Sequence, residues 1–240
     1  MIKGGQRIAT ATGVMLADLN CIGNALLGAA ESLFDPDFWR SRGELAAVSG
    51  GRGSAWFVGP AANPWVLRHY RRGGCIARIS ADRYGWSGEE RVRSFSEWRL
   101  LFDLSQRGLS VPKPVAAHYR REGLTYRCDL ITERIAHTRP LSAALGAGPL
   151  APSCWRAIGA AIARLHRQGV DHADLNAHNI LLGSDGRVSV IDFDRGRVRA
   201  PGAWTAGNLA RLERSLRKVS PPDRFAPASW DELLAGYRAA

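Results

Sequence analysis

The chain has few cysteines and no long apolar run. Its four cysteines, Cys21, Cys75, Cys128 and Cys154, lie far apart in 240 residues and form no C-x-x-C pair. This spacing argues against a zinc knuckle and a disulfide framework, so free thiols are expected. No stretch approaches the roughly 20 consecutive apolar residues that a membrane-spanning helix needs. We therefore expect any contact with a membrane to be peripheral.

The N-terminal region leans apolar without resembling a signal peptide. Within residues 9–30, the polar residues Asp18, Asn20 and Asn24 interrupt the apolar ones. Asp18 would lie inside any hydrophobic core of a signal peptide, so the segment is interpreted as folded chain.

Acidic residues are scarce relative to basic ones. The chain holds 22 Asp and Glu against 33 Lys and Arg, a formal net charge of +11, and the excess is mostly arginine. Arginine forks suit phosphate and carboxylate, so the charge predicts an anionic partner such as a nucleotide, a phosphorylated glycolipid or a membrane surface. The charge is not gathered in a tail, so a nucleic-acid-binding arm is not favoured. A surface that is basic only for solubility is the alternative.

The N-terminal half is predicted to be rich in strands. Apolar runs at 46–48 and 55–58 flank the glycine turn Gly50–Ser54, a pattern typical of a β-hairpin, and Trp65–Tyr70 predicts a third strand. Apolar residues at helical spacing predict a helix over Glu89–Ser105, which Gly108 ends. Further strands are expected at 111–118 and 126–132.

The C-terminal half is predicted to be mainly helical. Pro152 opens a helix with Trp155, Ile158, Ile162 and Leu165 on one face. A loop, a short hairpin of 180–182 with 188–191, and helices from residue 204 onward complete the order. The change from strands to helices falls near residues 133–141, so the chain is assigned to the α+β class with two lobes.

The loop between the first C-terminal helix and the hairpin carries the chemistry. It reads His172-Ala173-Asp174-Leu175-Asn176-Ala177-His178-Asn179, and Asp192-Phe193-Asp194 follows ten residues after Leu182. Phosphoryl transfer to an alcohol needs a carboxylate that orients the hydroxyl and accepts its proton, and oxygen ligands that hold Mg²⁺ against the phosphates. We predict Asp174 as the catalytic carboxylate and Asn179 and Asp192 as the magnesium ligands.

The loop also has two other interpretations. Its histidines and aspartates suggest a metal-ligand cluster, although they lack a known zinc spacing. That cluster would consist of His166, Asp171, His172, Asp174 and His178. The other is a coincidental polar turn. In the catalytic interpretation, His172 is expected to hold the loop by hydrogen bonds rather than to act as a base, and His178 to lie at the surface.

Both motifs resemble those of protein kinases. His172 to Asn179 is similar to the catalytic loop H-R-D-L-x-x-x-N, with Ala173 where arginine is usual. Asp192-Phe193-Asp194 is similar to D-F-G, with Asp194 in place of the glycine. The resemblance implies a two-lobed kinase-like fold with ATP and Mg²⁺ as cofactors.

The same resemblance extends to the nucleotide side. It implies that Gly51, Arg52 and Gly53 form the glycine-rich lid over the phosphates. Arg68 then occupies the position of the usual phosphate-binding lysine, and Glu97 that of the helix glutamate that pairs with it. Residues 133–134 would mark the hinge that meets adenine.

A more specific resemblance is to the 3-deoxy-D-manno-octulosonic acid (Kdo) kinases of Gram-negative bacteria. It spans about residues 34–215. The runs that carry it are Phe34–Pro36, Gly51–Gly53 with Trp56-Phe57, Val66–Gly74, His172–Leu182 and Ile191–Gly196. It implies phosphorylation of the 4-hydroxyl of Kdo on a lipid A precursor, by an enzyme peripheral to the cytoplasmic side of the inner membrane.

The resemblance and the charge together define the expected organisation. We expect a single kinase-like domain, with an N-lobe at about 34–135, a C-lobe at about 136–240 and residues 1–33 as an N-terminal extension. The partners expected are the anionic glycolipid and the membrane surface, and no nucleic acid. Candidates for gripping the glycolipid are Arg71, Arg72, Arg195 and Arg197.

Alternatives remain at this level. The acceptor could be a heptose of the lipopolysaccharide core, an aminoglycoside-like sugar or a protein tyrosine. The departures at Ala173, Arg68 and Asp194 also allow a non-catalytic kinase-like binding module. The presence of Asp174, Asn179 and Asp192 argues against such a module, because the reaction requires residues of these types in these roles.

Overall fold

The computed structural model describes residues 5–47, 55–62, 64–71, 82–221 and 224–240. The chain divides into two compact units. The first consists of Met1–Phe102 and Lys113–Arg134, and the second of Asp103–Pro112 and Ile135–Ala240. Strands dominate the described residues of the first unit and helices those of the second, which confirms the α+β class. The helix-rich unit begins at residue 135, within the predicted transition, but it also takes the segment 103–112.

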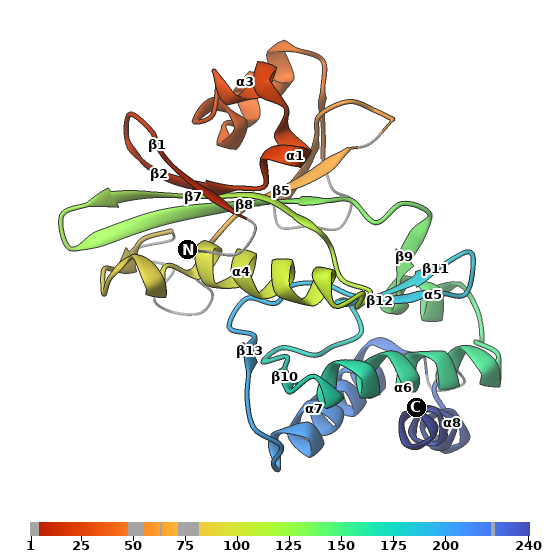
Figure 1. Ribbon diagram of the computed structural model, residues 1–240. Coiled ribbons are helices and arrows are strands. Elements are labelled where there is room, and N and C mark those ends of the chain that lie inside the picture. The colour runs from red at the N-terminus through yellow and green to blue at the C-terminus, as the bar shows by residue number, and fades with distance from the viewer. Residues whose placement is uncertain (1–4, 48–54, 63, 72–81, 222–223) are drawn as a thin grey trace. The chain divides into compact units, whose positions relative to one another are not determined.

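The first unit is built on an antiparallel sheet (Figure 1). Its strands lie in the order β1-β2-β7-β8-β5-β4-β3, with β6 paired to β8. Their bounds are β1 Gln6–Ala9, β2 Gly13–Ala17, β3 Leu45–Ala47, β4 Ala55–Val58, β5 Trp65–His69, β6 Tyr84–Gly85, β7 Pro114–Glu122 and β8 Thr125–Glu133. The predicted hairpin is confirmed by the pairing of Ala46 with Phe57, and the predicted third strand by the pairing of Phe57 with Val66.

Helices cover both faces of this sheet (Figure 1). Helix α4, Arg93–Gln106, lies on one face, where Phe95 meets Tyr119 edge to face. Short helices of the described residues lie on the other: α1 Leu19–Ile22, α2 Asn24–Leu27, the 3₁₀ helix Ser32–Phe34 and α3 Pro36–Ser41. The predicted helix start at Glu89 was wrong, because a separate 3₁₀ turn, Glu89–Arg91, precedes α4.

The N-terminal residues build much of the hydrophobic core. Met15, Leu33 and Trp39 are fully buried in one cluster with Trp65 and Leu67 of β5. The indole N–H of Trp39 donates to the carbonyl of Leu33 at 2.8 Å. Strands β1 and β2, absent from the sequence-based prediction, extend the sheet by pairing β2 with β7. Residues 5–33 are therefore an integral part of the first unit.

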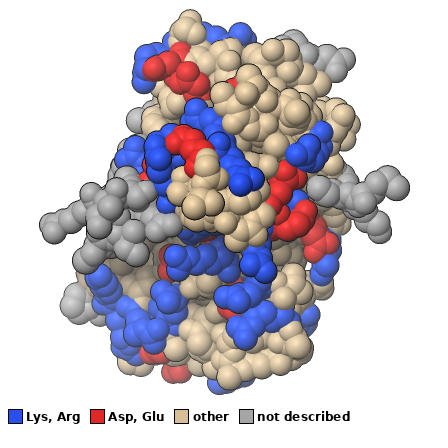
Figure 2. Space-filling model, turned by 90° about the vertical axis from the view of Figure 1, so that its left-hand side faces the viewer, with Lys and Arg blue, Asp and Glu red and all other residues tan. Residues whose placement is uncertain are grey.

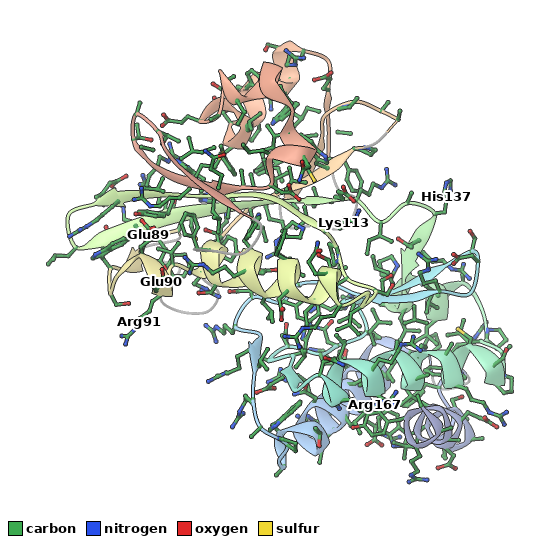
Figure 3. All side chains as sticks on the ribbon, viewed as in Figure 1. Glu89, Glu90, Arg91, Lys113, His137 and Arg167 are labelled. Atoms are coloured by element: carbon green, nitrogen blue, oxygen red, sulfur yellow. The ribbon has the colours of Figure 1, made fainter. Side chains whose placement is uncertain are left out.

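Glu89 ties this N-terminal edge to the approach to α4 (Figure 3). Its carboxylate accepts hydrogen bonds from Arg7 Nε at 2.9 Å and Arg7 Nη2 at 3.1 Å, and from the Tyr119 hydroxyl at 2.7 Å. The hydrogen bond from Arg7, with smaller contributions from Tyr119, holds the pKa of Glu89 below its ordinary value. The 3₁₀ turn that carries Glu89 is thus joined to β1 and β7.

In its described residues, the second unit combines four helices with two small sheets. The helices are α5 Leu141–Ala147, α6 Pro152–Arg167, α7 Trp204–Val219 and α8 Pro227–Ala239. The strands are β9 Thr138–Pro140, β10 Val170–Asp171, β11 Ile180–Gly183, β12 Val188–Val190 and β13 Arg197–Val198. In the described residues they form the orders β12-β11-β9 and β10-β13. The predicted helix from Pro152 and the predicted hairpin β11–β12 are both confirmed.

The buried face of α6 packs closely against α8. Trp155, Ile158 and Ile162 are almost fully buried on this helix. Between them, a Cβ at Gly159 would lie 1.9 Å from the carbonyl oxygen of Leu233. A Cβ at Gly236 would meet the carbonyl oxygen of Arg156 at 2.1 Å. Two glycines therefore permit backbone contact between the helices.

We expect Gly159→Ala to destabilise the protein by about 1–3 kcal/mol, because the added methyl group forces the two backbones apart. The matched control is Gly207→Ala in α7, where, apart from chain neighbours and the backbone of its own helix, no atom of the described residues lies within 4 Å of the added Cβ. That change gains helix propensity and should be neutral or stabilising by up to about 1 kcal/mol. Urea unfolding followed by circular dichroism measures both. Equal stability of the two variants would contradict close packing of α6 on α8.

His118 is a buried histidine on β7. It is 1% exposed, stacks on Phe34 with ring centroids 5.0 Å apart, and shares a hydrogen bond of 3.1 Å with the hydroxyl of Thr10. Burial lowers the pKa of His118 from 6.5 to about 4, against a weaker opposing effect of Asp129. The folded protein therefore holds this ring neutral at a pH where the unfolded chain protonates it.

This difference predicts an acid-sensitive contribution to stability. A folded pKa below the unfolded one gives stability that is complete above pH 6.5 and is lost as the pH falls toward about 4. Between pH 7.5 and pH 5, the unfolding free energy of the wild type should fall by about 2 kcal/mol more than that of His118→Gln. Urea unfolding at both pH values provides the comparison, and parallel losses in the two proteins would refute it.

Candidate active site

The loop that follows β10 is anchored at its start by a buried carboxylate. Asp171 is 7% exposed and accepts hydrogen bonds from Arg199 Nη1 at 2.9 Å and Asn208 Nδ2 at 3.0 Å. Burial alone would raise the pKa of Asp171, but the hydrogen bonds from Arg199 and Asn208 outweigh it and hold the pKa below its ordinary value. Arg199, which directly follows β13, and Asn208 of α7 therefore compensate the buried charge of Asp171.

His172 links this anchor to the segment that precedes Asp192. Its backbone N–H donates to Asn208 Oδ1 at 3.0 Å, and its Nε2 donates to the carbonyl of Ile191 at 3.0 Å. Its Nδ1 accepts from the backbone N–H of Asp174 at 3.3 Å. Burial lowers the pKa of His172, which keeps the ring neutral with its proton on Nε2. Both ring nitrogens are engaged, which fits the expected holding role rather than that of a base.

Asp174 lies at the exposed turn of the loop. Its side chain is 56% exposed. Oδ2 accepts from Asn176 Nδ2 at 3.1 Å, and Oδ1 accepts from Arg211 Nη1 at 3.2 Å. Each carboxylate oxygen can still accept a further hydrogen bond. An oriented and accessible carboxylate of this kind can meet an incoming hydroxyl.

Asn179 and Asp192 stand at neighbouring ends of the hairpin. The backbone N–H of Ile191 donates to the carbonyl of Asn179 at 2.9 Å, which places residue 192 beside residue 179. Asn179 Nδ2 donates to the carbonyl of Asp174 at 3.0 Å, so its Oδ1 points elsewhere and meets no donor in the described part of the chain. Asp192 has φ 65°, a left-handed conformation that costs energy and is typical of functional sites.

These two side chains suit Mg²⁺. A carboxylate and an amide oxygen are hard ligands, and Mg²⁺ usually takes only one or two protein carboxylates together with phosphates and water. The interpretation of the loop as a metal-binding cluster of histidines and aspartates was wrong. Over the described residues, no group of three or more His, Cys, Asp and Glu is placed to hold a metal ion. His166 instead bonds the Tyr237 hydroxyl at 2.8 Å, and His178 bonds the Ser142 hydroxyl at 2.9 Å.

The nucleotide-side residues belong to the first unit. Arg68 Nη2 donates to Glu97 Oε2 at 2.8 Å, so β5 and α4 carry the pair that the kinase resemblance implies. Glu97 is 3% exposed and also accepts from the hydroxyl of Tyr70. Burial, and then the charge of Glu97, raise the pKa of Tyr70 well above its ordinary value, so this hydroxyl stays a donor. Arg68 is thereby held in a fixed position.

The remaining predicted site residues lie either outside the described residues or at the exposed surface. Gly51, Arg52 and Gly53 of the expected lid and Arg72 lie outside the described residues. Arg71, Arg195 and Arg197 are exposed.

Helix α7 contributes residues that the sequence analysis missed. Asn208, Arg211 and Ser215 recur at helical spacing and face the loop. Asn208 is 7% exposed and bonds Asp171 and His172, Arg211 bonds Asp174, and Ser215 Oγ accepts from the backbone N–H of Ala177 at 3.1 Å. The available signal was Asn208 itself, because asparagine is a poor helix former in the interior of an amphipathic helix.

A strand-rich unit with a buried Arg–Glu pair, and a helical unit with an aspartate loop beside a metal-suited hairpin, define a protein-kinase-like phosphotransferase. The comparisons with known proteins agree. A model of the lipopolysaccharide kinase (Kdo/WaaP) family matches residues 36–237. The chain belongs to this family, and it is a kinase that transfers a phosphoryl group to a hydroxyl group.

Curated relatives are similar over most of the chain. A protein of Stenotrophomonas maltophilia strain K279a, named 3-deoxy-D-manno-octulosonic acid kinase, is 49% identical over 209 residues, which cover 86% of this chain and 81% of the relative. A protein of the same name from Xanthomonas axonopodis pv. citri strain 306 is 52% identical over 190 residues, covering 78% and 75%.

We expect Asn208→Ala to destabilise the protein by about 2–4 kcal/mol, because it removes the partners of a buried carboxylate and a buried backbone N–H. The control is Arg214→Ala, an exposed residue of the same helix, which should change stability by less than about 0.5 kcal/mol. Urea unfolding measures the loss, and hydrogen exchange at the His172 amide should accelerate. Unchanged protection of that amide would show that Asn208 does not anchor the loop.

Proposed function

We propose that this chain transfers the γ-phosphoryl group of ATP to the 4-hydroxyl of Kdo on a lipid A precursor, in the biosynthesis of the lipopolysaccharide inner core. Relatives that share about half of its residues bear the name of Kdo kinase. The observation that carries the proposal is the accessible carboxylate of Asp174, oriented by Asn176 and Arg211 on a loop with buried anchors.

Asp174 supplies the acid–base chemistry in this proposal. The acceptor hydroxyl donates its hydrogen bond to the carboxylate, which orients the oxygen toward the γ-phosphorus. As the new oxygen–phosphorus bond forms, the bond from the γ-phosphorus to the bridging oxygen breaks and its electron pair leaves with ADP. The hydroxyl proton passes to Asp174. Asn176 keeps the carboxylate in place during the transfer.

The phosphates of ATP are assigned to two further sets of side chains. Arg68, held by Glu97 and Tyr70, would bind the α- and β-phosphates through its guanidinium. Asn179 and Asp192 would hold Mg²⁺, which neutralises the charge that develops on the phosphates.

The basic surface supports an anionic glycolipid as the acceptor. Figure 2 shows Lys and Arg side chains on the surface of both units, with Asp and Glu side chains among them, and the whole sequence holds 33 basic residues against 22 acidic ones. Exposed Arg71, Arg195 and Arg197 are candidates for its phosphates and carboxylates. In the described residues, no helix is both long and apolar enough to span a bilayer. We infer peripheral association with the cytoplasmic side of the inner membrane.

The test combines the purified enzyme, Mg-ATP and a Kdo-lipid A precursor. We expect a mass gain of one phosphoryl group, located at C4 by phosphorus–proton NMR, and no product when the metal is chelated. Asp174→Asn should lower kcat by about 10²-fold or more, because an amide cannot accept the proton. Asp231→Asn, the same change at an exposed position of α8, serves as the control and should leave kcat unaltered.

Other results would redirect the proposal. Phosphate on a core heptose but not on Kdo would reassign the acceptor. Full activity of Asp174→Asn would remove Asp174 from the reaction and favour another base.

A further inference from the structure

Arg211 forms an exposed ion pair with the carboxylate assigned as the base. Its Nη1 lies 3.2 Å from Asp174 Oδ1, and the two side chains are 50% and 56% exposed. Ion pairs this exposed contribute little to folding stability. The fold therefore gains little stability from placing this guanidinium beside Asp174, and the pair stays accessible to an incoming acceptor.

The position of Arg211 is set from both sides along α7. One turn before it, buried Asn208 bonds the backbone N–H of His172 and the carboxylate of Asp171. One turn after it, Ser215 accepts the backbone N–H of Ala177. Residues at these spacings share one face of a helix. The face of α7 that anchors the loop thus also places Arg211 beside the exposed turn of the loop.

The guanidinium retains capacity for a second anion. The structure gives Arg211 one acceptor in the described part of the chain, Asp174 Oδ1, through a single nitrogen. A guanidinium has further N–H donors in the same plane, arranged to bind a carboxylate. These donors belong to the same guanidinium that contacts Asp174. They therefore lie close to the carboxylate oxygens that would orient the acceptor hydroxyl.

The proposed acceptor carries such an anion at the right place. Kdo is a 3-deoxy-2-keto sugar acid, so only C2 and an oxygen-free C3 separate its carboxylate from the carbon that bears the 4-hydroxyl. When that hydroxyl meets Asp174, the sugar carboxylate is necessarily close to a second negative charge. A cation beside Asp174 offsets this repulsion and gives the carboxylate a partner.

We infer that Arg211 is a specificity-determining residue that binds the carboxylate of the sugar-acid acceptor beside the catalytic Asp174. The inference rests on the proposed function and names the group through which the site selects sugar acids over neutral sugars. A neutral sugar with a hydroxyl in the same place leaves the guanidinium without its second partner.

The experiment compares two acceptors, the Kdo-lipid A precursor and its Kdo methyl ester, which keeps the 4-hydroxyl but lacks the carboxylate charge. The wild type should prefer the acid by about 10- to 100-fold in kcat/KM, the effect of one charge-assisted hydrogen-bond pair. Arg211→Gln should lose that preference, because its kcat/KM should fall by about 10- to 100-fold more on the acid than on the ester; the smaller loss that both acceptors share reflects the lost contact with Asp174. Arg211→Lys should retain part of it.

The control is Arg214→Gln, an exposed arginine of the same helix, which should keep the wild-type preference. Thermal unfolding of each variant verifies folding. Equal losses on acid and ester in Arg211→Gln, or an unchanged preference, would overturn the inference and leave the proposed function standing. A wild type that does not phosphorylate the Kdo lipid would overturn both.

Discussion

The buried contact between Asn208 and the start of the catalytic loop is the interaction on which the candidate site depends. One amide side chain accepts from the backbone N–H of His172 and donates to the carboxylate of Asp171. A buried carboxylate or N–H without a partner is costly, so this arrangement is strongly preferred over alternatives. It determines where His172 stands, and His172 in turn joins the backbones of Asp174 and Ile191.

The positions of the candidate catalytic side chains depend on this contact. Asp174 and Asn179 are linked through the Asp174 carbonyl, and Asn179 is linked to the strand that precedes Asp192. The left-handed backbone at Asp192 is retained because these neighbours hold it on one side and buried Phe193 on the other. Rigid support of this kind leaves the strained and exposed residues free for chemistry.

The departures from protein-kinase motifs are accommodated by local partners. Arg68 keeps a cation opposite Glu97, and Tyr70 adds a second donor to that buried carboxylate. Ala173 removes the arginine usual beside the catalytic aspartate, and Arg211 of α7 supplies a guanidinium at Asp174 instead. The N-terminal residues, for their part, contribute two strands and Trp39 to a core on the second face of the sheet.

The sequence by itself determined the α+β class, the hairpins and helix α6, and it singled out Asp174, Asn179 and Asp192 as candidate site residues, because those signals are local: glycine turns, helical periodicity and short motifs. It also indicated that Arg68 and Glu97 form a pair. It did not reveal β2, which pairs with β7 about 100 positions along the chain, or β1, which pairs with β2. Nor did it reveal Asn208, Arg211 and Ser215, since their partners lie in a distant loop. Only the tertiary structure brings α7 against that loop, because contacts between remote segments are decided by packing and by the need to satisfy buried polar groups.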